Sequence, residues 1–162
     1  MLDTQAMANE SASSSSGSSP SWGLVLVRIA VGAILLHAGW MKVSGGISDQ
    51  LVTSTRESFA NAPGIVRAWG ENVVLPHPTI FAHLIAWGEF LGGLALFLGA
   101  LTRIAGIAVS FQFVNFYFAG PESQRFFVLL LAVCGLGCAI SRAGRRCGLD
   151  VFLAERLPRW MT

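Results

Sequence analysis

Four apolar runs stand out along the chain. The first two, residues 23–43 (GLVLVRIAVGAILLHAGWMKV) and 79–101 (TIFAHLIAWGEFLGGLALFLGAL), each exceed twenty residues. A hydrocarbon core about 30 Å thick requires roughly 20 helical residues, because each residue rises about 1.5 Å. The other two, residues 104–119 and 126–141, are slightly short, which a thin bilayer or snorkelling arginines at their ends would accommodate. The pattern predicts four membrane-spanning helices.

The segments between and beyond these runs complete the predicted architecture. Gly120-Pro121 separates the last two runs, since proline cannot continue a helix. Residues 44–78 form the one long connection, partly amphipathic, which we expect to cap the bundle on its extracytoplasmic face. The Ser-rich residues 1–21 should be disordered, and residues 153–162 read as an amphipathic cytoplasmic tail. The predicted fold is an all-α integral membrane four-helix bundle over residues 22–152.

Composition and charge agree with a lipid environment. Of 162 residues, 53% are hydrophobic and 12% charged, with a mean hydropathy of +0.59, whereas a soluble domain is about a quarter charged. The net charge of +2 is spread out, so no nucleic-acid partner is indicated. Seven arginines fall on the side of the two termini against four basic residues opposite, which favours a topology with both termini in the cytoplasm.

Polar residues inside the runs are the candidate functional groups. Glu89, Gln112 and Asn115 lie near the bilayer midplane when counted from the helix ends, where a charged group costs about 3 kcal/mol. We therefore expect them to point inward at one another. Glu89 would be either neutral and hydrogen-bonded to Gln112 or Asn115, or ionised and paired with Arg28 or Lys42.

Other positions suggest helix packing or cofactor contacts. Arg28, Gly39 and Lys42 share one stripe of the first helix, and small residues such as Gly92 permit close helix approach. His37 and His83 fall at similar depth on consecutive helices. Such a pair can ligate haem, but with no further signature we expect ordinary hydrogen bonding for His83 and a pocket-lining role for His37.

The cysteines point to packing more than to chemistry. Cys134 and Cys138 share a helix face at i and i+4, with no third ligand beside them, so we expect them to pack and predict no metal site. Cys147 lies in a basic stretch that could lower the pKa of its thiol. A surface thiol without a partner is nevertheless usually inert.

Several stretches resemble the DoxX/DoxD family of four-helix bacterial membrane proteins. They are LVRIAVGAILLHAGWMK (Leu26 to Lys42), WGEFLGGLALFLGALTRIAG (Trp87 to Gly106), NFYFAG (Asn115 to Gly120) and AGRRCGLD (Ala143 to Asp150). The likeness is greatest to the DoxD-type small subunit of thiosulfate:quinone oxidoreductase. By resemblance, the motif positions to carry over are Gly39, Lys42, Glu89, Gly92, Gly93, Gly99, Arg103 and Asp150. Cys147 departs from the pattern, standing where many relatives are expected to have an aromatic residue.

The resemblance implies a quinone-linked redox subunit, in which thiosulfate oxidised to tetrathionate supplies electrons to membrane quinone. Glu89 and Lys42 would be the catalytic pair, and His37, Arg28, Gln112 and Asn115 would contact the quinone. A DoxA-like or other redox subunit would be the partner, and a homo-oligomer is also compatible with the sequence. The alternative is a non-catalytic membrane scaffold that recruits a redox partner through the SRAGRR segment and the C-terminal tail. A small-solute transporter is a weaker alternative, because the chain shows no inverted repeat.

Overall fold

The structure is a computed structural model that describes residues 22–46, 49–60, 62–141 and 148–153. Within these ranges the chain is helical and contains no β-strand. The helices, in chain order, are α2 (Trp22–Ser44), α3 (Asp49–Ala60), α4 (Gly64–Trp69), the π-helical turn η1 (Gly70–Val74), α5 (Pro78–Leu98), α6 (Thr102–Ala119), the 3-10 turn η2 (Glu122–Gln124), α7 (Arg125–Ser141) and α8 (Asp150–Leu153). The predicted tail 1–21 lies outside the described residues, as does the predicted tail 153–162 apart from Leu153, the last residue of α8.

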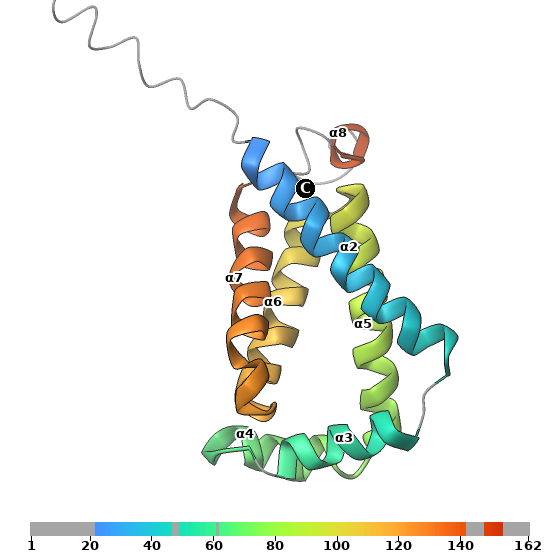
Figure 1. Cartoon of the computed structure of the whole chain (residues 1–162), viewed down its shortest axis with the longest axis vertical. Helices are drawn as coiled ribbons and strands as arrows, with labels where there is room; N and C mark the ends of the chain where they lie inside the picture. Colours follow the sequence, from blue (N-terminus) through green and yellow to red (C-terminus); the bar gives the residue numbers. More distant parts are fainter. Residues whose placement is uncertain (1–21, 47–48, 61, 142–147, 154–162) are drawn as a thin grey trace, which may run out of the picture.

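Four long helices run along the molecule, while short ones lie at its two ends (Figure 1). Helices α3 and α4 lie across one end, called here the capped end, and α8 lies at the other, called the α8 end. Among the described helical segments, three are long and apolar enough to cross a membrane: α2, α5 and the continuous segment Glu122–Ser141, which contains α7. Helix α6 has only 18 residues, and its polar Arg103, Gln112 and Asn115 lower its hydropathy. A fourth crossing therefore stays a prediction.

Local sequence explains where α5 and α6 begin and end. Pro78 occupies the first turn of α5, where its missing N–H costs no hydrogen bond. Gly99 follows the helix with φ of 67°, the left-handed conformation that glycine adopts without strain. Helix α5 therefore ends at Leu98, before the predicted residue 101, and α6 starts at Thr102, two residues before the predicted 104.

Glycines bring the long helices together in two close pairs. A Cβ atom added at Gly39 of α2 would lie 2.3 Å from the backbone nitrogen of Phe90, and one at Gly93 of α5 would lie 2.3 Å from that of Leu36. The backbones of α2 and α5 are thus in direct contact, as small residues allow in membranes. Helices α6 and α7 meet in the same way, since a Cβ at Gly106 would lie 2.5 Å from the carbonyl oxygen of Gly135.

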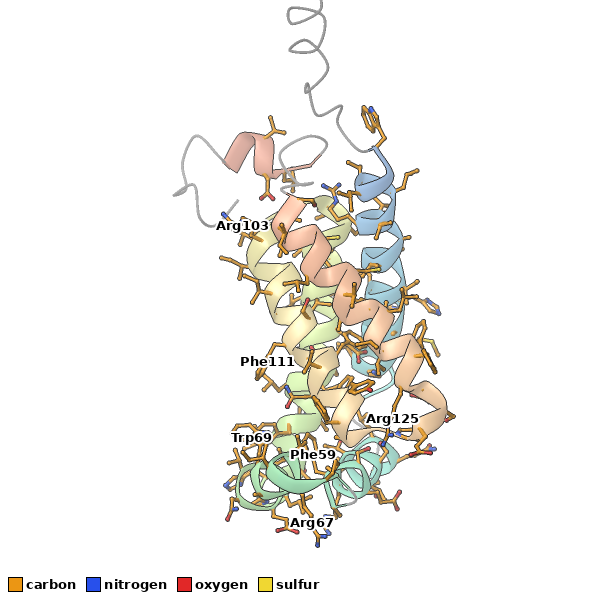
Figure 2. All side chains as sticks on the ribbon, turned by 90° about the vertical axis from the view of Figure 1, so that its left-hand side faces the viewer. Phe59, Arg67, Trp69, Arg103, Phe111 and Arg125 are labelled. Atoms are coloured by element: carbon orange, nitrogen blue, oxygen red, sulfur yellow. The ribbon has the colours of Figure 1, made fainter. Side chains whose placement is uncertain are left out.

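The outer surface has an apolar middle and charged ends. Large apolar side chains such as Leu26, Phe111 and Leu130 are more than half exposed. Arg103 lies near the α8 end, while Arg67 and Arg125 lie at the capped end (Figure 2). An exposed apolar surface of this extent between charged ends suits a bilayer, not water.

The connection between α2 and α5, called here the cap, packs against the ends of the long helices, whereas its extracytoplasmic location stays a prediction. Helix α3 buries Thr55 and Phe59, and Phe59 packs in a second apolar cluster with Ala62, Val74 and Ala119. This cluster fastens the connection between α2 and α5 to the end of α6. The cap therefore forms a roof over the ends of the long helices.

Candidate functional site

The central feature of the site is an ion pair between α2 and α5. The Nζ of Lys42 donates to Oε2 of Glu89, and the Glu89 residue is only 3% exposed. The close contact between Gly39 and Phe90 brings Lys42, one helical turn beyond Gly39, beside this carboxylate. Of the alternatives left open by the sequence, the structure shows pairing with Lys42. Burial strengthens this attraction because the surroundings screen it poorly.

The other two polar residues predicted to lie near the midplane are bonded elsewhere. The side-chain nitrogen of Gln112 donates to the carbonyl oxygen of Ile85 at 3.2 Å, and that of Asn115 donates to the carbonyl oxygen of Phe111 on its own helix at 2.8 Å. The structure therefore does not show the alternative in which Glu89 bonds to Gln112 or Asn115. Gln112 reaches only the backbone of the helix that carries Glu89.

Arg28 and His37 do not lie where a shared site with Glu89 requires. Arg28 is 1% exposed but lies at the far end of α2, where its Nη1 would be 2.5 Å from a Cβ added at Gly99. His37 is exposed on α2, as His83 is on α5. Residue 37 is two positions, or about 200°, from the buried stripe through Leu35 and Gly39, so the pocket-lining role of His37 stays a prediction.

Asp150 has a structural role that the sequence did not reveal. Its buried carboxylate accepts hydrogen bonds from the backbone N–H groups of Leu101 at 2.6 Å and Thr102 at 3.0 Å, and its own N–H donates to the carbonyl oxygen of Gly99 at 2.8 Å. An acidic side chain at a helix N-terminus satisfies unpaired N–H groups there and complements the helix dipole. Asp150 thereby fastens the α8 segment to the turn between α5 and α6.

The remaining sequence candidates fall outside the ion-pair region. Cys138 is buried in the main apolar core and Cys134 packs against it, whereas Cys147 and the Ser141 to Arg146 segment lie largely outside the described residues. Within the ranges that the structure describes, no three His, Cys, Asp or Glu side chains gather closely enough to hold a metal ion.

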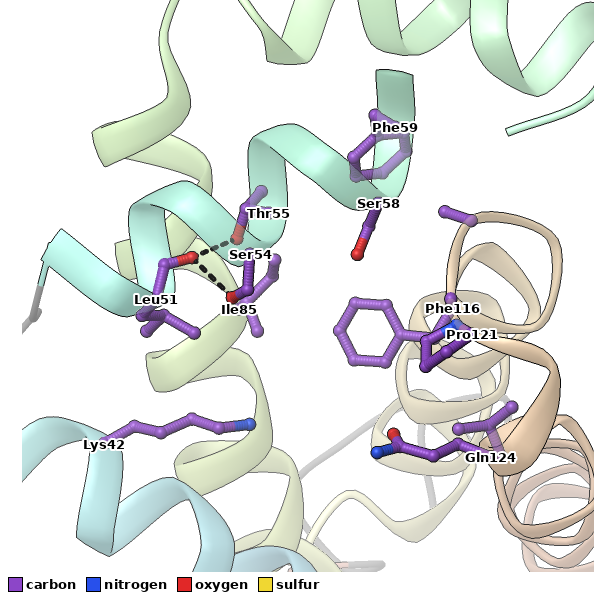
Figure 3. Close-up of a pocket in the computed structure, with 13 residues that line it drawn as sticks. Lys42, Leu51, Ser54, Thr55, Ser58, Phe59, Ile85, Phe116, Pro121 and Gln124 are labelled. Carbon is purple, nitrogen blue, oxygen red and sulfur yellow. Dashed lines mark hydrogen bonds between the residues drawn. The ribbon is translucent and has the colours of Figure 1, made fainter. Parts of the chain in front are cut away.

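A small chamber lies under α3, next to Lys42. Its volume is about 150 Å³, and the Lys42 side chain extends into it below the hydroxyl-bearing face of α3 (Figure 3). Its polar lining comes from the cap, from Lys42 and from Gln124, and its apolar lining from the long helices. The chamber is lined by Lys42, Leu51, Ser54, Thr55, Ser58, Phe59, Ile85, Phe116, Ala119, Gly120, Pro121, Gln124 and Val128.

A larger, mostly apolar cavity of about 330 Å³ lies between α5, α6 and the cap. Five aromatic rings contribute to its wall, and the two amides Gln112 and Asn115 are its principal polar groups. Phe59, Ile85 and Phe116 line this aromatic cavity and the chamber alike. The two spaces therefore share a wall. The aromatic cavity is lined by Phe59, Trp69, Val74, Phe81, Leu84, Ile85, Gly88, Ala108, Phe111, Gln112, Asn115 and Phe116.

These features define a helical membrane protein with a buried ion pair and two adjoining cavities at its capped end. The family model described as DoxX matches residues 23–121, which include both partners of the pair. The chain belongs to the DoxX family. No curated protein and no solved structure matches the chain.

Proposed function

We propose that this DoxX family protein is a quinone-linked redox subunit, with a quinone ring held in the aromatic cavity. The observation that carries the proposal is the position of this cavity. It opens among lipid-facing side chains, with Leu84 64% and Phe111 69% exposed, and it shares a wall with the chamber that contains Lys42. A membrane-dissolved ligand would thus meet an ionisable pair near its binding site.

The chemistry of the lining fits a quinone. Phe81, Phe111 and Phe116 offer ring faces and edges for stacking, and a cavity of about 330 Å³ is within the range of small-molecule sites. Each side-chain amide carries two N–H donors. Gln112 and Asn115 use one in the bonds described above, so the second can be directed at a quinone carbonyl oxygen.

The ion pair would serve proton transfer. Reduction of a bound quinone takes two electrons and two protons and forms the hydroquinone. Glu89 would carry protons, and Lys42 would hold the carboxylate in place and stabilise its charge. In the thiosulfate version of the reaction, two thiosulfate ions join through a new S–S bond to form tetrathionate and release the two electrons. A partner redox subunit would carry out that oxidation in the bacterial cytoplasmic membrane.

Quinone binding to the purified, full-length protein tests the proposal. Gln112→Leu and Asn115→Leu should each weaken binding by about tenfold, because each removes a hydrogen bond of about 1 kcal/mol and leaves a ligand carbonyl unpaired. Val114→Leu, on an exposed face of α6 outside the aromatic cavity, is the matched control. Unchanged quinone affinity in a folded Gln112→Leu/Asn115→Leu double variant would refute the site.

Turnover in native membranes separates this proposal from the scaffold alternative. Glu89→Gln should abolish quinone reduction while quinone binding and helical content persist, because a neutral amide cannot carry the proton. A scaffold predicts the reverse pattern, in which Glu89→Gln is silent and truncation after Ser141 abolishes the activity of the complex.

A further inference from the structure

We infer that a hydrated route under α3 connects water at the capped end with Lys42, and that protons enter the Lys42–Glu89 pair from that side of the membrane. The inference deepens the proposed function, on which the use of the proton rests. The route itself stands on the burial of Glu89, on the partial exposure of Lys42 and on three adjoining spaces under the cap.

The two partners differ in their access to solvent. The side chain of Lys42 is 32% exposed, while that of Glu89 is 4% exposed. Lys42 lines the chamber and also a groove of about 550 Å³ between the end of α2 and the start of α3. The ammonium group is therefore the link between the buried carboxylate and the outside of the helix bundle.

A second groove, of about 480 Å³, lies on the other side of the chamber. It is lined by Glu57, Glu122 and Arg125, and Ser54 and Ser58 line both this groove and the chamber. Ser54 lines all three spaces. The spaces therefore adjoin along the underside of α3 and form one track, with polar and apolar lining, that passes Lys42.

The chamber has the size and the lining to hold water. A volume of about 150 Å³ has room for several molecules, since about 10–15 Å³ of such volume holds one. The hydroxyl groups of Ser54 and Thr55 donate to the carbonyl oxygen of Leu51, at 3.0 and 2.8 Å. Their oxygens can accept hydrogen bonds from water, and the amide of Gln124 offers both donors and an acceptor.

The seam between α2 and α5 is closed on the opposite side of the pair. Toward the α8 end, backbone contacts at Gly39, Gly93 and Gly32 leave no space for a side chain, with added Cβ atoms only 2.3, 2.3 and 2.5 Å from the facing backbone nitrogens. Water between these helices is excluded by this packing. Access along the seam is therefore from the capped end.

Proton entry along this route has a simple balance. The Lys42 ammonium passes one proton to the Glu89 carboxylate, and the neutral amine then takes one proton that the water in the chamber relays from the solvent at the capped end, so the chamber water is left unchanged. The pair has gained one proton and one positive charge, which it loses again when Glu89 passes the proton on. The charged groups along the track are Glu57 on α3, Glu122 on η2 and Arg125 on α7, and the Arg125 Nη1 donates to Oε1 of Glu122 at 3.1 Å.

The sequence permits a direct test, because Lys42 is the only lysine in the chain. Sulfosuccinimidyl acetate, which does not cross membranes, is added to sealed vesicles of either orientation, and acetylation of Lys42 and of the N-terminal amine is measured by mass spectrometry. Since Lys42 and Trp22 lie at opposite ends of α2, we expect the two amines to react from opposite sides of the membrane.

A pair of variants on α3 tests the path itself. Ser54→Phe should slow acetylation of Lys42 by about tenfold or more, because the rate follows the fraction of time that the route is open. Thr53→Phe is the control, since Thr53 is exposed on the same helix but lines none of the three spaces. The inference would be overturned by any of three results. They are acetylation of Lys42 from the side of the N-terminus, acetylation of Lys42 only after denaturation, and equal effects of the two variants.

This labelling requires no quinone, so it fails independently of the proposed function. One-sided, Ser54-dependent labelling in a protein that binds no quinone would support the route and refute the quinone role. Quinone binding in a protein whose folded form resists labelling would refute the route alone.

Discussion

Replacing Lys42 by methionine removes the charged partner of Glu89 but keeps an unbranched side chain of similar length. Removal of one member of a buried pair costs about 3–5 kcal/mol, because the other charge is left in a poorly polarisable environment. With its side chain 4% exposed, the Glu89 carboxylate would be that uncompensated charge in the variant. We therefore expect Lys42→Met to lower the free energy of unfolding by about 3 kcal/mol.

Denaturant unfolding in detergent micelles at pH 7 measures the loss, with Lys42→Met/Glu89→Gln as the control that should recover most of the stability, because no charge is then left buried. A loss below about 1 kcal/mol, or no recovery in the double variant, would contradict the buried pair.

Two further predictions concern packing and helix termini. Gly93→Ala should lower the melting temperature in detergent, because its methyl group would lie 2.3 Å from the Leu36 nitrogen and overpacking costs about 1–3 kcal/mol. Gly137→Ala is the control: this glycine has open space around it, so the substitution should raise stability by up to about 1 kcal/mol through helix propensity. Equal effects of the two substitutions would refute the close contact. Asp150→Ala should lower the free energy of unfolding by about 2 kcal/mol and speed hydrogen exchange at the Leu101 amide, since a buried acceptor is lost. Unchanged exchange at that amide would show that the carboxylate does not accept its hydrogen bond.

The existence of the long helices α2 and α5 could be predicted from the sequence, because a helix that crosses a bilayer needs an apolar run of a defined minimum length. The runs at 23–43 and 79–101 coincide with α2 and α5 to within three residues. Gly39 could likewise be assigned to a helix contact from its place on the stripe with Arg28 and Lys42, whereas Gly93 was carried over from the family resemblance. Membership of the DoxX family follows the same motifs and is confirmed.

The pairing of Glu89 could not be chosen from the sequence because it depends on how α2 and α5 are aligned. Arg28 and Lys42 lie on the same stripe of α2, fourteen residues apart. Only the contact of Gly39 with Phe90 decides which cation meets the carboxylate. The exposure of His37, by contrast, was available from its angle on the helix. The roof that α3 forms over the pair depends on tertiary packing, which periodicity does not encode.

The glycine contacts have a mechanical consequence. They hold α2 against α5, and α6 against α7, as two closely packed helix pairs. Lys42 and Glu89 belong to the first pair, whereas the chamber is lined by Ile85 from that pair and by Phe116 and Val128 from the other. A rotation of one helix pair relative to the other would widen or narrow the chamber without lengthening the ion pair. Opening the path to the carboxylate and preserving its charge partner are thus separable movements in this molecule.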